Sequence, residues 1–147
     1  MLEIHLFVRK HFMANLHAGS CLCGSVKFEI VGEFKKFFLC HCSRCRKTSG
    51  SAHCANLFAP GAQLHWLSGE EKISFYKHEG TNFAKNFCSV CSALLPVDAK
   101  AREMVVVPAG CLDTDVDITP QAHLCTDSKG NWDNIMHDVQ CFANMPG

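Results

Sequence analysis

The sequence has no excess of charge of either sign, since 14 lysine and arginine residues balance 14 aspartate and glutamate residues among 147. Proteins whose main ligand is nucleic acid carry a basic excess gathered on one face or segment, whereas the cations here are scattered along the chain. The sequence also has no apolar run near the ~20 residues that cross a membrane. We therefore expect neither nucleic acid nor a membrane as the principal partner.

An export signal is also missing from the start of the chain. The apolar stretch at residues 2–8 is interrupted by Glu3 and His5, and basic residues follow it, whereas in a secretory signal they precede it. Without such a signal we expect a cytoplasmic protein, in which cysteines are kept as thiols.

No internal repeat, low-complexity tract or flexible linker divides the sequence. We expect one domain at residues 17–147, preceded by an N-terminal extension at residues 1–16. Met13 is a candidate natural start, which would make the residues before it an upstream addition. An alternative is an extra strand, predicted by the alternating apolar residues Leu2, Ile4, Leu6 and Val8.

Long helices are not expected, because no segment keeps a 3.6-residue apolar period for three turns. Val26, Phe28 and Ile30 alternate with charged residues, as in a half-buried strand. Runs between turn residues predict further strands at residues 52–58, 63–67, 72–77, 104–107 and 121–125. Short helical turns are predicted at residues 43–48 and near residues 132–138. The expected fold class is mainly β with irregular loops.

Cysteine is the residue that the sequence has in plenty, with 11 in the chain. A chain of this length buries enough surface to fold without disulfides, and an odd number of cysteines cannot be paired completely within it. Seven of them form three tight groups, which are Cys21 with Cys23, then Cys40, Cys42 and Cys45, and lastly Cys88 with Cys91. In a reducing compartment such clusters bind metal or carry out chemistry more often than they form disulfides.

The first and last groups predict one closed metal site. A two-residue spacer, as between Cys88 and Cys91, aims two sulfurs at one ion, and a one-residue spacer does the same where a strand runs into a turn. Cys21 and Cys23 stand beside glycine and serine residues that favour such a turn. Together the two pairs provide four thiolates for a structural zinc ion.

The middle group predicts a site of another kind. Cys40, Cys42 and Cys45 can occupy three corners of a tetrahedron, and three protein ligands with one exchangeable position are what zinc uses in catalysis. The open corner would take water or a substrate thiolate. The alternative is a second closed site, with the fourth ligand taken from Cys54, His53 or His41.

The residues around this loop offer partners for an anionic substrate. Arg44, Arg46 and Lys47 carry positive charge, and the hydroxyl of Ser49 adds a hydrogen-bond donor. A solvated basic loop is an equally good interpretation of the same residues. Seven thiolates and two Zn²⁺ ions would bring the neutral chain to a net charge of about −3, which argues further against nucleic acid.

Three ordered stretches resemble a known family. They are residues 19–26 (Gly-Ser-Cys-Leu-Cys-Gly-Ser-Val), 40–47 (Cys-His-Cys-Ser-Arg-Cys-Arg-Lys) and 87–91 (Phe-Cys-Ser-Val-Cys). They are similar to the glutathione-dependent formaldehyde-activating enzymes, also called S-(hydroxymethyl)glutathione synthases, whose domain also occurs in centromere protein V. Residues 108–113, His123 and Trp132 also look like family positions, so the resemblance spans residues 17–147.

The resemblance implies a zinc-binding β-tent fold, shared with a Rab GTPase chaperone and the methionine-R-sulfoxide reductases. It assigns Cys21, Cys23, Cys88 and Cys91 to a structural zinc, and Cys40, Cys42 and Cys45 to a catalytic zinc. It implies a carbon–sulfur lyase that detoxifies formaldehyde, in which glutathione's sulfur reaches the second zinc and adds to formaldehyde. One departure is Ser92, where the family commonly has a glycine that would suit a positive φ.

Two other functions stay open at this point. One is a non-catalytic, zinc-stabilised binding module with a protein partner, in which the second metal is enclosed or absent. The other is a thiol-redox enzyme that uses Cys54 or Cys111, which would require an accessible thiol of low pKa.

Overall fold

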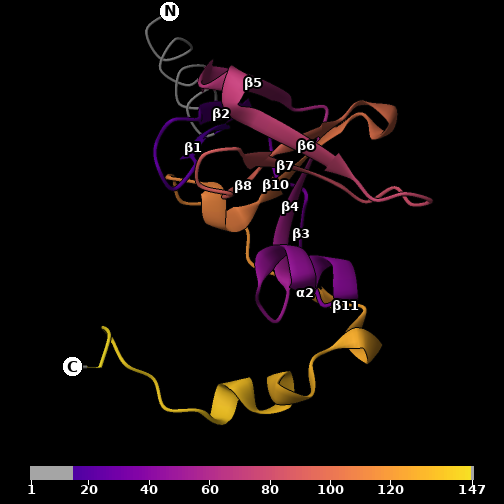
Figure 1. Ribbon diagram of the computed structural model, residues 1–147, viewed down its shortest axis with the longest axis vertical. Coiled ribbons are helices and arrows are strands. Elements are labelled where there is room, and N and C mark those ends of the chain that lie inside the picture. The colour runs from indigo at the N-terminus through magenta and orange to yellow at the C-terminus, as the bar shows by residue number, and fades with distance from the viewer. Residues whose placement is uncertain (1–14, 147) are drawn as a thin grey trace, which may run out of the picture.

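The computed structural model describes residues 15–146, except the side chains of residues 135–137. The strand expected at residues 2–8 lies outside the described residues. Within them the chain forms three β-sheets joined by short helical turns, which confirms the mainly β fold class (Figure 1). None of the helices in residues 15–146 is long and apolar enough to cross a membrane.

The first sheet has the strand order β1-β2-β5, with β1 at Leu16–Ser20, β2 at Lys27–Val31 and β5 at Gln63–Ser68. The central sheet has the order β11-β3-β4-β10-β9. Its strands are β3 at Lys36–Cys40, β4 at Cys54–Pro60, β9 at Val97–Ala99, β10 at Met104–Pro108 and β11 at Ala122–Leu124. The third sheet has the order β6-β7-β8, with β6 at Ile73–Lys77, β7 at Ala84–Cys88 and β8 at Leu94–Leu95.

The helical elements are all short. The α-helix α2 spans Ser43–Ser49 and confirms the turn expected at residues 43–48. The 3₁₀ turns are η1 at Glu70–Lys72, η2 at Lys100–Arg102, η3 at Ala109–Cys111, η4 at Thr126–Ser128 and η5 at Asn131–Asp138. The last of these confirms the helical turn expected near residues 132–138. In Figure 1, α2 and β11 lie at one end of β3 and β4, and the C-terminal segment passes beneath them.

The expected strands at residues 26–30, 52–58, 63–67, 72–77, 104–107 and 121–125 all exist, with ends that shift by up to two residues. Five others, β1, β3, β7, β8 and β9, were not expected. The reason differs among them. Residues 37–39 of β3 are apolar without alternation, whereas β7 begins with Ala84, Lys85 and Asn86, and neither pattern marks a half-buried strand.

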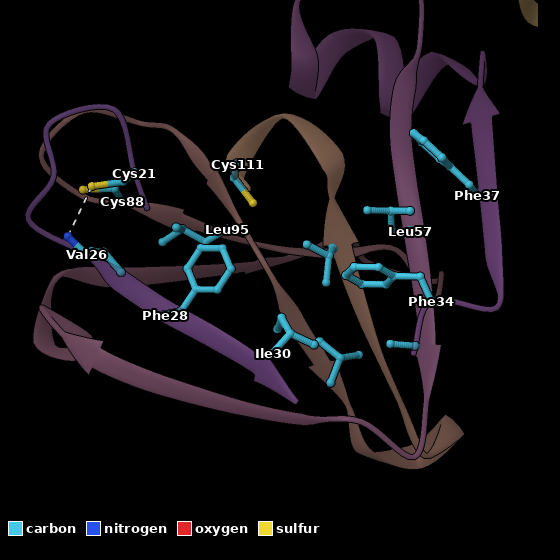
Figure 2. Packing of buried hydrophobic residues seen from close by; sticks show 13 residues of the cluster. Cys21, Val26, Phe28, Ile30, Phe34, Phe37, Leu57, Cys88, Leu95 and Cys111 are labelled. Atoms are coloured by element: carbon cyan, nitrogen blue, oxygen red, sulfur yellow. Dashed lines mark hydrogen bonds between the residues drawn. The ribbon is translucent and has the colours of Figure 1, made fainter. Parts of the chain in front are cut away.

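The core lies between the first sheet and the inner face of the central sheet. On β2, Phe28 and Ile30 are fully buried, and in Figure 2 their side chains fill the space beside Leu57 and Leu95. Because side chains alternate across a strand, Leu57 and its neighbours two residues away face this core, and the residues between them face the other side. The outer face of the central sheet is therefore free to carry a site.

Candidate metal centres and the adjoining pocket

The first cysteine cluster gathers sulfurs from two loops that are about 65 residues apart in sequence. The Sγ atoms of Cys21, Cys23, Cys88 and Cys91 all lie within 4.8 Å of one another. Cys23 Sγ is 3.5 Å from Cys21 Sγ and 3.9 Å from Cys88 Sγ. Four sulfurs around one zinc at about 2.3 Å stand about 3.8 Å apart. The sulfur positions therefore fit a tetrahedral zinc site.

Backbone hydrogen bonds fix both loops of this cluster. The Cys21 N–H donates to the Val26 carbonyl at 3.0 Å, and the Ser92 N–H donates to the Cys88 carbonyl at 2.8 Å. Ser92 has φ of 62°, so this chain keeps the left-handed turn for which the family uses glycine. The Ser25 hydroxyl lies 3.3 Å from Cys23 Sγ and lowers the pKa of this thiol to about 6, which favours the metal-binding thiolate.

The second cluster lies where β3 runs into α2. Cys40 ends β3, Cys42 is the N-cap residue of α2, and Cys45 lies in its first turn. Their Sγ atoms lie within 4.8 Å of one another, and the Cys45 N–H donates to Cys42 Sγ at 3.4 Å. A strand end followed at once by a helical turn thus brings three thiols to one point. This group could hold a metal ion.

No fourth Cys, His, Asp or Glu ligand atom joins this group among the described side chains. Cys54 lies nearby and buried, but it turns toward the helix and donates from Sγ to the Cys45 carbonyl at 3.4 Å. The neighbouring thiol of Cys45 lowers the pKa of Cys54 to about 6, and the thiol of Cys54 together with burial raises the pKa of Cys45. The rings of His41 and His53 also stay outside the group. Cys54, His53 and His41, the candidates for a fourth ligand, therefore do not join the three sulfurs.

A cavity of about 870 Å³ adjoins the second cluster on the outer face of the central sheet. Its wall includes Cys40, Cys42 and Cys45, and its floor includes the alternating residues Cys54, Asn56 and Phe58 of β4. Phe75 of β6, residues 81–85 and η2 complete the wall. The half-buried Cys40 and Cys42 and the buried Cys45 thus stand at the edge of a cavity large enough for a small peptide.

Positive side chains dominate the charged lining of this cavity. They are Arg44, Lys77, Lys85, Lys100 and Arg102, against the one carboxylate of Asp98. The Arg44 guanidinium lies 5.9 Å from the ring centre of Phe83, and Lys85 Nζ lies 5.2 Å from that of Phe87. These contacts hold the two cations beside the cavity.

Of the four residues expected to bind substrate, one lines the cavity and three do not. Arg44 lines the cavity, whereas Arg46, Lys47 and Ser49 lie outside its lining. Ser49 Oγ donates to the Cys45 carbonyl at 2.8 Å, so its hydroxyl is used within the helix. The other cations of the cavity come from sequence positions 77–102, far in sequence from the cysteine loop. Only the fold brings them to the same cavity.

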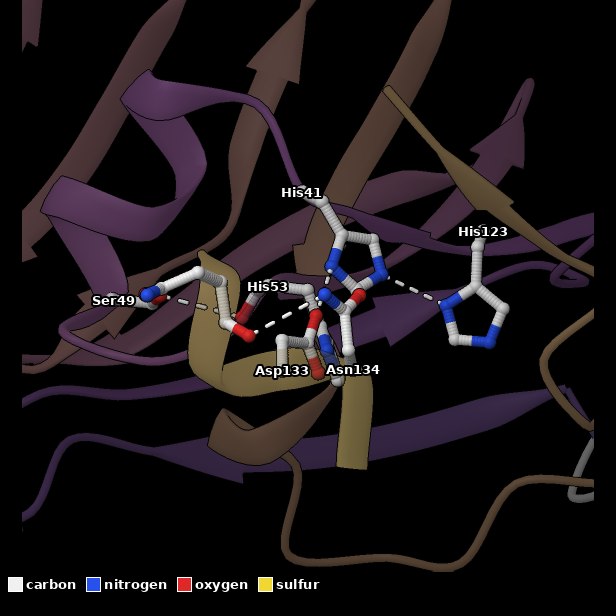
Figure 3. A network of polar contacts seen from close by, with 7 residues as sticks. His41, Ser49, His53, His123, Asp133 and Asn134 are labelled. Carbon is white, nitrogen blue, oxygen red and sulfur yellow. Dashed lines mark hydrogen bonds and ion pairs between the residues drawn. The ribbon is translucent and has the colours of Figure 1, made fainter. Parts of the chain in front are cut away.

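Sequence reasoning also missed a polar cluster beside the same loop (Figure 3). His41 Nε2 lies 2.8 Å from His123 Nδ1, and His41 Nδ1 lies 2.8 Å from Asp133 Oδ2. The ring centre of His53 lies 5.1 Å from that of His41, and burial lowers the pKa of His53. The histidine positions are visible in the sequence, but nothing there links them to Asp133.

The thiol Cys111, a candidate in the redox hypothesis, is poorly suited to that role. Its side chain is buried, and its Sγ donates to the Pro108 carbonyl at 2.9 Å. Burial raises the pKa of Cys111 to about 12, so the thiol is protonated at neutral pH.

Comparisons with known proteins agree with this geometry. The profile of the family described as "Glutathione-dependent formaldehyde-activating enzyme" matches residues 16–128. A relative from Halomonas elongata, named "Putative glutathione-dependent formaldehyde-activating enzyme", is 35% identical in an alignment of 137 positions that covers 87% of this chain and 87% of the relative. A crystal structure of a Rhodobacter sphaeroides protein has the same fold, with a TM-score of 0.54 and 21% identity over 73% of this chain and 98% of its own. The chain therefore belongs to the glutathione-dependent formaldehyde-activating enzyme family, and its three-sheet architecture is the β-tent expected from the resemblance.

Proposed function

We propose that this protein is a zinc-dependent enzyme of the carbon–sulfur lyase type, which interconverts formaldehyde and glutathione, or a related thiol, with the S-hydroxymethyl adduct. The observation that carries the proposal is the group of three sulfurs from Cys40, Cys42 and Cys45 at the wall of a cavity with mostly positive charged side chains. Family membership supports the same substrate class.

The donor sets fit two zinc ions with different roles. Cys21, Cys23, Cys88 and Cys91 provide four sulfurs for a structural ion, and the second group provides three for a catalytic ion. Bound at the second group, zinc would supply an exchangeable position that favours the thiolate form of a substrate thiol at neutral pH.

The cavity residues would bind the rest of the substrate. Glutathione carries two carboxylates, and cations that line the cavity, such as Arg44 and Arg102, offer charge-assisted hydrogen bonds to them. The floor from Cys54 to Phe58 is about 13 Å long at the rise of an extended strand. An extended tripeptide spans about 10 Å, so it fits this length.

The chain's aromatic residues would keep water away from the reacting atoms. Phe38, Phe58, Phe75 and Phe83 all line the cavity. In the forward reaction the substrate sulfur bonds to the formaldehyde carbon, the carbon–oxygen double bond becomes a single bond, and the thiol proton ends on that oxygen. No electrons are gained or lost overall, so the reaction needs no oxidant or reductant.

We place this activity in the cytoplasm. All 11 cysteines lie in the described part of the chain, and all of them there are free thiols. A reducing compartment keeps such thiols available for metal, and it is also where glutathione is abundant in its thiol form.

The test is the rate at which formaldehyde and glutathione exchange with their adduct at equilibrium, followed by magnetisation-transfer NMR. The zinc-loaded protein at catalytic concentration should exceed the spontaneous rate, and Cys42→Ser should abolish the excess. Cys141→Ser, which changes an exposed and isolated cysteine, should leave the rate unchanged. A protein that holds both ions but gives only the spontaneous rate would instead be a non-catalytic binding module.

A further inference from the structure

The buried ring of His41 connects the loop of the second cluster to other segments of the chain. His41 stands between Cys40 and Cys42 in sequence, and its side chain is only 2% exposed. Each of its ring nitrogens faces a different segment, with His123 Nδ1 at 2.8 Å on one side and Asp133 Oδ2 at 2.8 Å on the other (Figure 3). The ring therefore bridges the cysteine loop and the C-terminal part of the chain.

The two partners of His41 come from different elements of the fold. His123 lies on β11, which pairs in parallel with β3 so that His123 stands opposite Leu39. The His41 N–H donates to the Leu124 carbonyl at 2.9 Å, which extends this pairing into the loop. Asp133 belongs to η5, and its side chain is only 9% exposed. His41 thus makes one backbone hydrogen bond and two ring contacts with the C-terminal part of the chain.

The contact between His41 and Asp133 joins two polar groups that are both shielded from solvent. His41 Nδ1 and Asp133 Oδ2 lie at the distance of an ion pair, and neither atom has a hydrogen-bond partner. Removing either group would leave the other buried and unpaired, which is costly.

The first cluster has no such dependence. Its loops are fixed by backbone hydrogen bonds, including those from Cys21 to Val26 and from Ser92 to Cys88. Cys21 and Cys23 follow β1, and Cys88 and Cys91 stand at the end of β7 and in the turn after it, so none of these cysteines belongs to η5 or β11. A change at Asp133 should therefore affect the second cluster and spare the first.

We propose that His41 is a positioning residue, held by Asp133 and His123, which keeps Cys40 and Cys42 in the arrangement that binds metal. Consecutive Cα atoms are about 3.8 Å apart, so a displaced His41 must move the cysteines on both sides of it. The role rests on the proposed use of this cluster as a metal site. It concerns retention of the ion, and His41 does not itself touch substrate.

The experiment measures zinc content per chain, and the cobalt(II) spectrum of the substituted protein, during a timed challenge with a chelator. We expect Asp133→Ala to lose one of two ions at least about tenfold faster than the unchanged protein, as for other groups that orient metal ligands. Asp133→Asn, which keeps an accepting oxygen, should be intermediate. Asp127→Ala removes an exposed carboxylate from η4 and should behave like the unchanged protein.

The ion that is lost is identified by comparison with Cys40→Ser, which should show the spectrum of the one-ion state from the start. A double change, His41→Ala with Asp133→Ala, should lose the ion no faster than His41→Ala alone, because both act through one contact. If His41→Ala fails to fold, the series at Asp133 decides. Equal loss of both ions in Asp133→Ala, or unchanged retention of both, overturns the proposal. The experiment measures retention of the ions and not turnover. A protein that retains two ions but lacks activity would therefore contradict the proposed function and leave the role of His41 standing.

Discussion

Cys40 and Cys54 lie directly opposite each other on β3 and β4, yet only Cys40 belongs to the group of three sulfurs. The thiol of Cys54 donates to the Cys45 carbonyl at 3.4 Å, on the floor of the cavity. In the proposed function, the remaining corner of the second cluster would be taken by an external ligand. The predictions below follow from this arrangement.

Replacing Cys54 should not change the number of metal ions. Because its sulfur lies outside the group, we expect Cys54→Ala to bind two ions per chain, with a loss of about 1 kcal/mol in the free energy of unfolding from the smaller buried side chain. Elemental analysis and denaturant unfolding provide the two measurements. Loss of one ion in this variant, to the same extent as in Cys42→Ala, would mean that Cys54 is a ligand.

Breaking the first cluster should cost more stability than breaking the second. The first joins the loop after β1 to the end of β7, and Cys88 is fully buried. We expect Cys88→Ser to lower the free energy of unfolding by more than about 3 kcal/mol, because binding of a structural ion is coupled to folding. Thermal unfolding of Cys88→Ser and Cys42→Ser, compared side by side, checks this. Equal decreases would argue against a division into structural and catalytic sites.

Ser92→Gly should stabilise the protein. Ser92 has φ of 62°, a region that costs a residue with a Cβ atom about 1–2 kcal/mol and glycine almost nothing. Glycine loses more backbone entropy on folding, so we expect a net gain of about 1 kcal/mol and a rise in Tm of a few degrees. Ser89→Gly, at a position in the same turn without positive φ, should lower Tm. A decrease in Tm for Ser92→Gly would contradict this explanation of the turn.

Lys85→Met should weaken substrate binding without slowing the chemical step. Its ammonium group is available to a substrate carboxylate in the cavity, whereas methionine keeps much of the apolar stem. We expect KM for glutathione to rise about tenfold, the value of one charge-assisted hydrogen bond, while kcat stays the same. Lys35→Met changes a cation that pairs with Glu33 outside the cavity and serves as the control.

The Lys85→Met substitution should not change the rate of reaction with a thiol that has no carboxylates. With 2-mercaptoethanol in place of glutathione, we expect the variant and the unchanged protein to have the same rate. An equal loss for both thiols would mean that Lys85 acts on the cluster and not on the substrate.

The sequence was sufficient to predict the mainly β class and the division of seven cysteines into two groups. Metal ligands with short spacers are visible in sequence because the geometry of the ion restricts the local backbone. The resemblance drew attention to Ser92, where the family commonly has glycine, but it left open whether the turn keeps a positive φ, which the structure gives as 62°.

The contacts that depend on tertiary structure were not predictable. Lys77, Lys85 and Arg102 line the same cavity as the second cluster, although they come from β6, β7 and η2. Asp133 meets His41 across more than ninety residues of sequence. No periodicity or spacing links such residues, since their proximity results from how the sheets pack.

The most direct measurement of the central claim is the absorption spectrum of the cobalt(II)-substituted protein during a titration with glutathione. If Cys40, Cys42 and Cys45 leave one corner for a substrate sulfur, we predict that thiolate-to-cobalt charge transfer at the second cluster rises by about a third, as three sulfurs become four. S-methylglutathione, which has the same carboxylates but no thiol, should not produce this rise. A spectrum that glutathione leaves unchanged while both ions are bound would contradict an open, thiol-accepting metal site.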